Sequence, residues 1–257
     1  CFKRSQKNDP FFYLPACNLL FRRRLFLEIG GFKEELVVVE DVDLCWRIRK
    51  RGYQIEYRPE GRVYNKHRNK VFSFCRRRFE YGTSEPLLNK LHPDKIKKLC
   101  FPLMTSLFWV SIILSIIPGY RPLFVISGAA VVADTIKNIL KIRRREIPIK
   151  VSSLLLSVLR SYLAFFHHIA SFVSRYYLFL FLIILPIVPL VSTIFLMLHL
   201  LAGTVDYVIK KPRLNMVSFL FYFSLDQLSY QLGVWWGCFK NICFRPINPT
   251  IVKKISV

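Results

Sequence analysis

Long apolar segments in the second part of the chain constrain its fold more than any other feature. Residues 101–118 contain no charged side chain, and residues 177–202 contain no Lys, Arg, Asp or Glu. Runs of this length are sufficient for a helix that crosses the hydrocarbon core of a bilayer. We therefore predict a helical transmembrane and interfacial domain over residues 101–257.

Two further apolar segments carry polar residues. Residues 122–140 contain Asp134 and Lys137, which at this spacing can pair on one helix face, and a short linker before them predicts a helical hairpin with residues 101–118. Residues 151–176 also contain basic and histidine side chains, so this segment either lies in the interface or crosses as a helix with one polar face.

The number of crossings follows from prolines and flanking charges. Pro186 and Pro189 predict a kink in the span over residues 177–202. Residues 214–239 carry Asp226 among aromatic side chains, which favours an interfacial or re-entrant helix over another span. Basic residues around the runs place their ends in the cytosol and favour four spans in a multi-pass cell-membrane protein.

The composition limits the kinds of molecule that the chain is expected to bind. The net charge is +23 and 53% of the residues are hydrophobic, a combination typical of a basic membrane protein. Nucleic-acid binding is the usual alternative, but here the basic residues separate apolar runs, which suits anionic lipid headgroups better. We predict no nucleic-acid partner. The seven cysteines form no C-x-x-C pair, which argues against a disulfide framework and against a zinc site. It indicates that the cysteines lie on the reducing, cytosolic side of the membrane.

The stretch from Val39 to Arg47 places two adjacent carboxylates, Glu40 and Asp41, at the predicted start of a helix. Apolar residues recur on one face of that helix, and Gly52 is well placed to end it. Unpaired backbone N–H groups and the helix dipole favour an ionised carboxylate there. Such a carboxylate is a candidate general base for a hydroxyl; the alternative is an ordinary acidic first turn.

Other elements flank this stretch in a fixed order. A predicted strand over residues 16–21 precedes a short helix, Arg23–Ile29, which ends at Gly30-Gly31. After the acidic helix, residues 54–58 form a predicted half-buried strand, and a second short strand begins at Val63-Tyr64. In this order, the motifs of about residues 11–68 resemble the acceptor half of family 2 glycosyltransferases.

The resemblance implies a GT-A fold and inverting transfer of a sugar from a nucleotide-sugar. It implies that Asp41 is the catalytic base and that Glu40 is its neighbour in the same motif. It also implies that the turn at Gly30 and Gly31 faces the acceptor, and it assigns Asp43 to substrate binding.

The resemblance further implies a divalent metal, Mg or Mn, held mainly by an upstream nucleotide-binding half with an Asp-x-Asp motif. No Asp-x-Asp precedes the acceptor motif here, so we interpret the chain as the C-terminal part of a longer protein. Relatives often place histidines after the last strand of this half. The matching positions here are Asn65 and His67, so His67 is the predicted metal ligand, and a merely solvated loop histidine is the alternative.

Residues 71–100 are predicted to form a basic amphipathic linker at the membrane surface. Because an arginine guanidinium matches phosphate geometry, we assign Arg77 to substrate binding; the alternative is a solvated basic face in contact with lipid. Tyr81-Gly82-Thr83-Ser84 and residues 225–238 resemble the mycofactocin-type membrane glycosyltransferases within family 2. Relatives carry Asp-Asp where this chain has Asp226-Gln227.

The predicted fold class is therefore α/β: the acceptor part of a GT-A domain over residues 1–70, the linker 71–100, and the helical membrane domain 101–257. The resemblance implies transfer of a hexose, glucose, from a UDP-linked donor to a peptide-derived redox cofactor, with the catalytic part in the cytoplasm. Relatives also act on peptides, glycans and lipids, so a polysaccharide or lipid glycosyltransferase is an alternative. A non-catalytic membrane carrier is another.

Overall fold

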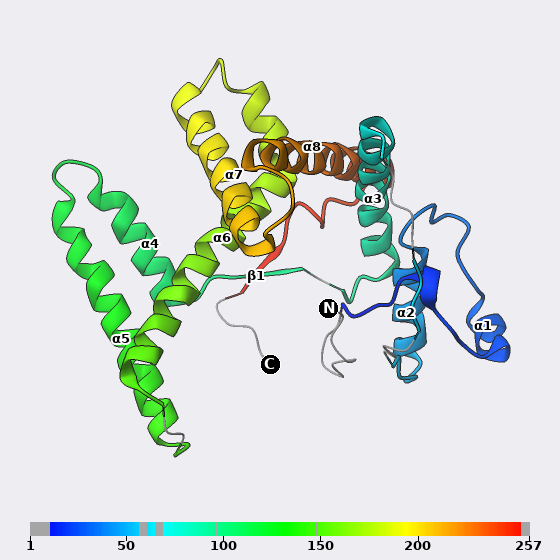
Figure 1. Cartoon of the computed structure of the whole chain (residues 1–257), viewed down its shortest axis with the longest axis horizontal. Helices are drawn as coiled ribbons and strands as arrows, with labels where there is room; N and C mark the ends of the chain where they lie inside the picture. The colour runs from blue at the N-terminus through cyan, green and yellow to red at the C-terminus, as the bar shows by residue number, and fades with distance from the viewer. Residues whose placement is uncertain (1–10, 57–60, 65–68, 96, 147–148, 253–257) are drawn as a thin grey trace. The chain divides into compact units, whose positions relative to one another are not determined.

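Most of the chain that the structure describes is helical (Figure 1). The computed structural model describes residues 11–56, 61–64, 69–95, 97–146 and 149–252. The chain divides into two compact units. The first comprises Cys1–Lys97, Arg175–Ile183 and Val217–Pro249, and the second comprises Lys98–Ser174, Ile184–Met216 and Thr250–Val257.

The first unit begins with three short helical elements: η1 (Ala16–Asn18), α1 (Arg23–Ile29) and α2 (Glu40–Lys50). Both predicted helices, α1 and α2, are confirmed. The glycines that follow them adopt the positive φ angles that end helices, 84° at Gly30 and 86° at Gly52. Buried apolar side chains tie the N-terminal segment and α1 to α2, among them Leu14, Ile29, Leu44, Cys45, Ile48 and Ile55.

The strand predicted at residues 16–21 is wrong. Residues 16–18 form the 3-10 helix η1, and residues 19–22 are without regular structure. A strand requires a hydrogen-bonded neighbour, and the described part of the first unit contains none. Residues 54–56 and 61–64 likewise have no regular structure, and the remainder of the predicted strand at 54–58 lies outside the described residues.

The first unit also contains two long helices, α3 (Val71–Leu91) and α8 (Met216–Asn241), which cross in Figure 1. Their backbones touch at glycines. A Cβ atom on Gly233 would lie 2.1 Å from the carbonyl oxygen of Phe79, and one on Gly82 would lie 2.1 Å from that of Tyr230. Side chains are therefore excluded at this crossing, as in small-residue helix contacts within membranes.

The second unit holds the remaining described helices, one of which continues into the first unit after Ser174, and a small sheet. The strands β1 (Lys98–Cys100) and β2 (Thr250–Val252) pair in parallel, with Lys98 opposite Thr250. The helices are α4 (Leu103–Ser115), α5 (Phe124–Arg143), preceded by η2 (Arg121–Leu123), α6 (Val151–Ile183) and α7 (Pro189–Lys210).

The predicted hairpin of the first two apolar runs is confirmed, and Figure 1 shows α4 and α5 as neighbours. The hydroxyls of Ser111 and Ser127 join them at 2.7 Å. Polar side chains also join α6 to α7: Ser174 lies 2.6 Å from His199, and His167 lies 3.4 Å from Asp206. The residue numbers rise along one helix as they fall along the other, so these helices are antiparallel.

Among the described residues, three helices are long and apolar enough to cross a membrane: Arg121–Arg143, Val151–Ile183 and Pro189–Lys210. The helix in the first apolar run, α4, has only 13 residues, fewer than the roughly 20 that a span needs, so this run does not supply the predicted full-length helix. The crossing predicted for residues 151–176 has a helix of sufficient length. The direction of each helix through the membrane stays a prediction.

The span predicted over residues 177–202 has the wrong bounds. The helix α6 continues to Ile183, residues 184–188 are not helical, and α7 begins at Pro189. Proline lacks the N–H that an inner helical turn needs but fits the first turn of a helix. The two prolines therefore separate two helices, where we predicted a kink within one.

Candidate active site

The catalytic pair of the predicted site lies at the start of α2. Its N-cap, Val39, has φ 63° and ψ 16°, a left-handed conformation that is disfavoured for a β-branched side chain. The Asp41 carboxylate accepts hydrogen bonds from the backbone N–H of Ala16 at 3.2 Å and of Val42 at 2.8 Å. These contacts fix the orientation of a side chain that remains partly exposed.

Asp43, two residues further along the helix, is buried. It accepts hydrogen bonds from Nε2 of His92 at 2.8 Å and from Nε of Arg47 at 2.8 Å. Burial alone would raise the pKa of this carboxyl, but the hydrogen bonds from His92 and Arg47 and the charges of Arg47 and Lys33 outweigh it and lower the pKa. The side chain joins α2 to the end of α3.

Arg47 extends this network to the glycine turn. Its guanidinium donates to the carbonyl oxygens of Ile29 at 2.7 Å and Gly31 at 2.6 Å. These are carbonyls at the C-terminal end of α1, where the helix leaves them without internal partners. Asp43 therefore positions Arg47, and Arg47 holds the turn at Gly30 and Gly31.

Replacing Asp43 by Asn is expected to destabilise the fold at neutral pH by about 2 kcal/mol, because hydrogen bonds to a charged group contribute 1.5–3 kcal/mol. Since folding lowers the pKa of Asp43, its stabilising effect is complete above the ordinary value of 3.8 and is lost as the pH falls through the lower folded pKa. Thermal unfolding of the two proteins between pH 2 and 7 tests this: the difference in melting temperature should shrink below pH 4. A constant difference would contradict it.

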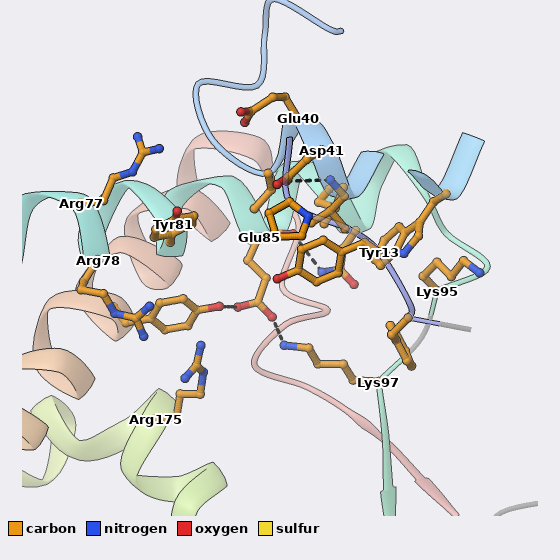
Figure 2. A pocket seen from close by; sticks show the side chains of 18 residues that line it. Tyr13, Glu40, Asp41, Arg77, Arg78, Tyr81, Glu85, Lys95, Lys97 and Arg175 are labelled. Atoms are coloured by element: carbon orange, nitrogen blue, oxygen red, sulfur yellow. Dashed lines mark hydrogen bonds and ion pairs between the residues drawn. The ribbon is translucent and has the colours of Figure 1, made fainter. Parts of the chain in front are cut away.

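A cavity of about 600 Å³ lies beside the start of α2 (Figure 2). Its walls come from the N-terminal segment, α2, α3, the segment after α3, the end of α6 and α8, all within the first unit. The charged and tyrosine side chains that line it are Tyr13, Glu40, Asp41, Arg77, Arg78, Tyr81, Glu85, Lys95, Lys97, Arg175 and Tyr230. The predicted base, Asp41, thus lines a cavity large enough for a small organic substrate.

A buried carboxylate, Glu85, organises the far wall of the cavity. It accepts hydrogen bonds from the hydroxyls of Tyr176, at 3.1 Å, and Tyr230, and it pairs with Lys97. Figure 2 shows the Glu85 side chain reaching from α3 toward Lys97. Burial and the charge of Glu85 raise the pKa of Tyr230, so its hydroxyl stays a donor. Glu85 therefore links α3, α6 and α8.

The arginines of the cavity are held by partners. The Tyr230 ring lies under the guanidinium of Arg175, whose central carbon is 3.8 Å from the ring centroid, a cation–π contact. Arg78 pairs with Asp226, and Arg77 pairs with Glu80 at 3.2 Å and lies over the ring of Tyr81. These contacts preorganise the guanidinium groups toward the cavity.

Two side chains that line the cavity, Arg77 and Tyr13, have raised pKa values. Burial opposes the charge on Arg77, but its hydrogen bonds to Glu80 and Tyr81 outweigh burial and raise the pKa of the guanidinium. Burial and the nearby charge of Asp41 raise the pKa of Tyr13. At neutral pH, the cavity therefore presents a cationic arginine and a neutral phenol that can donate a hydrogen bond.

The structure brings together some of the predicted site residues. Glu40, Asp41 and Arg77 line the cavity. Asp43 and the turn of Gly30 and Gly31 do not line it and belong to the network beneath α2, so their assignment to substrate binding stays a prediction. The predicted metal ligand, His67, lies outside the described residues.

Sequence reasoning missed most of the far wall. Glu85, Arg175 and Tyr230 are distant in the chain and carry no shared motif. The available signal was the Gly-x-x-x-Gly spacing of Gly233 and Gly237, which is typical of close helix contacts and would have predicted a partner helix for this part of α8.

The divalent metal implied by the resemblance is expected mainly in an upstream half, so it stays a prediction. In residues 11–56, 61–64, 69–95, 97–146 and 149–252, no three His, Cys, Asp or Glu side chains are grouped so that together they could hold a metal ion. Magnesium is often held by only one or two carboxylates together with substrate phosphates, so the grouping of these side chains does not test the prediction. We therefore derive no chemical step through a metal.

The amino-acid sequence of the chain is similar to those of two known proteins. Two curated relatives, from Mycobacterium tuberculosis strains CDC 1551 / Oshkosh and ATCC 25618 / H37Rv, are each named pre-mycofactocin glycosyltransferase. Each is 25% identical to this chain over 246 residues, which cover 93% of the chain. The chain is similar to pre-mycofactocin glycosyltransferases.

The similarity confirms the resemblance to mycofactocin-type enzymes. It extends over 51% of each relative, so the chain spans about half the length of the curated proteins that it matches. No model of a known protein family matches the chain. No solved structure matches it either.

Proposed function

We propose that this chain is the acceptor-side part of a membrane-anchored inverting glycosyltransferase, which moves a hexose from a nucleotide-sugar to an acceptor hydroxyl. The observation that carries the proposal is the position of Asp41. Its oriented, partly exposed carboxylate lines a cavity of about 600 Å³ in a chain similar to pre-mycofactocin glycosyltransferases. Residues 1–70 are then part of a GT-A domain whose donor-binding half lies elsewhere in the protein.

The reaction assigns one proton transfer to Asp41. The carboxylate takes the proton of the acceptor hydroxyl as that oxygen forms a bond to the anomeric carbon of the donor sugar. The bond from this carbon to the diphosphate breaks, and its electron pair leaves with the nucleoside diphosphate. Attack opposite the leaving group inverts the anomeric configuration. The N–H of Ala16 holds the carboxylate in place throughout.

In this proposal, the donor is UDP-glucose and the acceptor is a peptide-derived redox cofactor precursor. The names of the two relatives support the acceptor class. The lining also suits it, because Tyr13, Trp46 and Tyr81 offer aromatic surfaces beside charged groups that can bind hydroxyls. Arg77 is proposed to bind a phosphate or carboxylate of the substrates. A divalent metal, His67 included among its ligands, remains part of the proposal outside the described residues.

The membrane part of the proposal rests on the three helices that are long enough to span a bilayer. The catalytic unit is proposed to face the cytoplasm, where nucleotide-sugars are made.

The carrier alternative would use Asp134, His167 and Asp226. Each of these has a partner within its own unit: Tyr162 at 2.9 Å, Asp206 at 3.4 Å, and Arg78.

A transfer assay on the full-length protein tests the proposal. Membranes that contain the protein are incubated with radiolabelled UDP-glucose and a synthetic peptide-derived acceptor, and the anomeric configuration of the product is determined by NMR. We expect acceptor-dependent release of UDP and a β-linked product, the inverted configuration. Glucose retained in the α configuration would refute inversion. Solute uptake into vesicles without any transfer would favour the carrier.

A further inference from the structure

A second cavity of the first unit, of about 370 Å³, lies where α3 and α8 both end. Its charged lining residues are all cationic: Lys90 from the last turn of α3, Lys240 from the last turn of α8, and Arg245 just beyond it. We call it the basic pocket. Its other lining residues are Pro93, Asn241, Ile242 and Cys243, so it contains no carboxylate. It shares no residue with the candidate active site.

The cations of the basic pocket are not neutralised within the described residues. Neither Lys90 nor Lys240 has a hydrogen bond or ion pair to any side chain in that part of the chain, and Arg245 donates only to the carbonyl oxygen of Pro93, at 3.3 Å. The cations around the active site differ, since Arg77 and Arg78 pair with carboxylates. The dipole at the C-terminus of a helix favours a nearby cation. This explains why a lysine lies at the end of each helix, but it provides neither lysine with an anionic partner.

The surface beside the basic pocket is apolar and exposed. Trp236, Phe239 and Ile242 follow one another at intervals of three residues at the end of α8, and their exposed fractions are 61%, 62% and 86%. Ile242 also has φ 50°, a left-handed conformation that is disfavoured for a β-branched residue. A strained backbone that presents an isoleucine to the surface is expected where the side chain has a function.

These two features select one kind of partner. Unpaired cations require an anion, and the adjacent aromatic and aliphatic side chains require an apolar medium. We propose that the basic pocket binds the phosphate of an anionic phospholipid headgroup, with Trp236, Phe239 and Ile242 in contact with its acyl chains. The lipid would hold the end of α8 at the membrane surface. This inference is independent of the reaction proposed above.

Native mass spectrometry of the detergent-solubilised full-length protein tests the pocket. The probes are dioctanoyl phosphatidylglycerol, dioctanoyl phosphatidylcholine and inorganic phosphate. We expect the anionic lipid to bind and the zwitterionic lipid to bind much more weakly. In the triple variant Lys90→Gln, Lys240→Gln and Arg245→Gln, affinity for phosphatidylglycerol should fall roughly 100-fold, because each basic residue near an anionic surface contributes about a fivefold effect.

A matched variant separates the pocket from general charge. Lys210→Gln, Lys211→Gln and Arg213→Gln remove the same charge at the end of α7 and just beyond it, in the second unit, and should leave most of the affinity unchanged. An equal loss in both triple variants would overturn the proposal. So would binding of inorganic phosphate as tight as that of the lipid, since the apolar surface would then contribute nothing. A circular dichroism spectrum equal to that of the wild type shows that each variant is folded.

Discussion

The variant Asp41→Asn is expected to reduce sugar transfer by about 100- to 10,000-fold, the contribution typical of a general base. An asparagine has the same shape as an aspartate, and its amide oxygen can still accept the hydrogen bond from the N–H of Ala16, although its amide nitrogen cannot accept the one from Val42. It cannot take up the proton of the acceptor hydroxyl at neutral pH. The side chain should therefore stay in place while the chemical step slows.

Two measurements separate chemistry from binding in this variant. Single-turnover rates report the transfer step, and calorimetry reports affinity for the nucleotide-sugar, which we expect to change less than threefold. Asp94→Asn is the matched control, because Asp94 is exposed and does not line the cavity. Transfer by Asp41→Asn at the wild-type rate would refute the base assignment.

The variant Gly233→Ala is expected to destabilise the first unit by about 3 kcal/mol or more. The added Cβ would lie 2.1 Å from the carbonyl oxygen of Phe79, and a backbone atom cannot move aside as a side chain can. The two helices must separate instead, which loses contacts along the crossing. Because Tyr230 lies one turn before Gly233, separation would also withdraw its ring from Arg175 and its hydroxyl from Glu85.

Gly128→Ala provides a matched control for this substitution. Gly128 also lies within a helix, α5, but no atom lies within 4 Å of its added Cβ. Alanine has a higher helix propensity than glycine, so this variant should be as stable as the wild type or slightly more so. Thermal unfolding in detergent compares the three proteins. Equal melting temperatures for both variants would contradict the close crossing of α3 and α8.

Local sequence patterns predicted the elements whose signals lie within one stretch of chain. The acidic first turn at Glu40 and Asp41, the glycine that ends α2, and the hairpin of α4 and α5 all follow from residues near one another. The prediction of a strand at 16–21 was wrong, because a strand also needs a hydrogen-bonded neighbour, and the described part of the first unit contains none. The position of the break between α6 and α7 depended on which of the two prolines begins a helix. Pro189 begins α7, and Pro186 lies between the two helices.

The sequence by itself determined that the chain has helices long enough for a membrane and a carboxylate pair at a helix start, because hydrophobic length and capping chemistry are local properties. Only the tertiary structure decided what surrounds Asp41. Glu85, Arg175 and Tyr230 come from three helices and meet because glycines let α3 and α8 touch. These residues are up to 145 positions apart in the chain. A periodic pattern along the sequence carries no information about contacts between such distant positions.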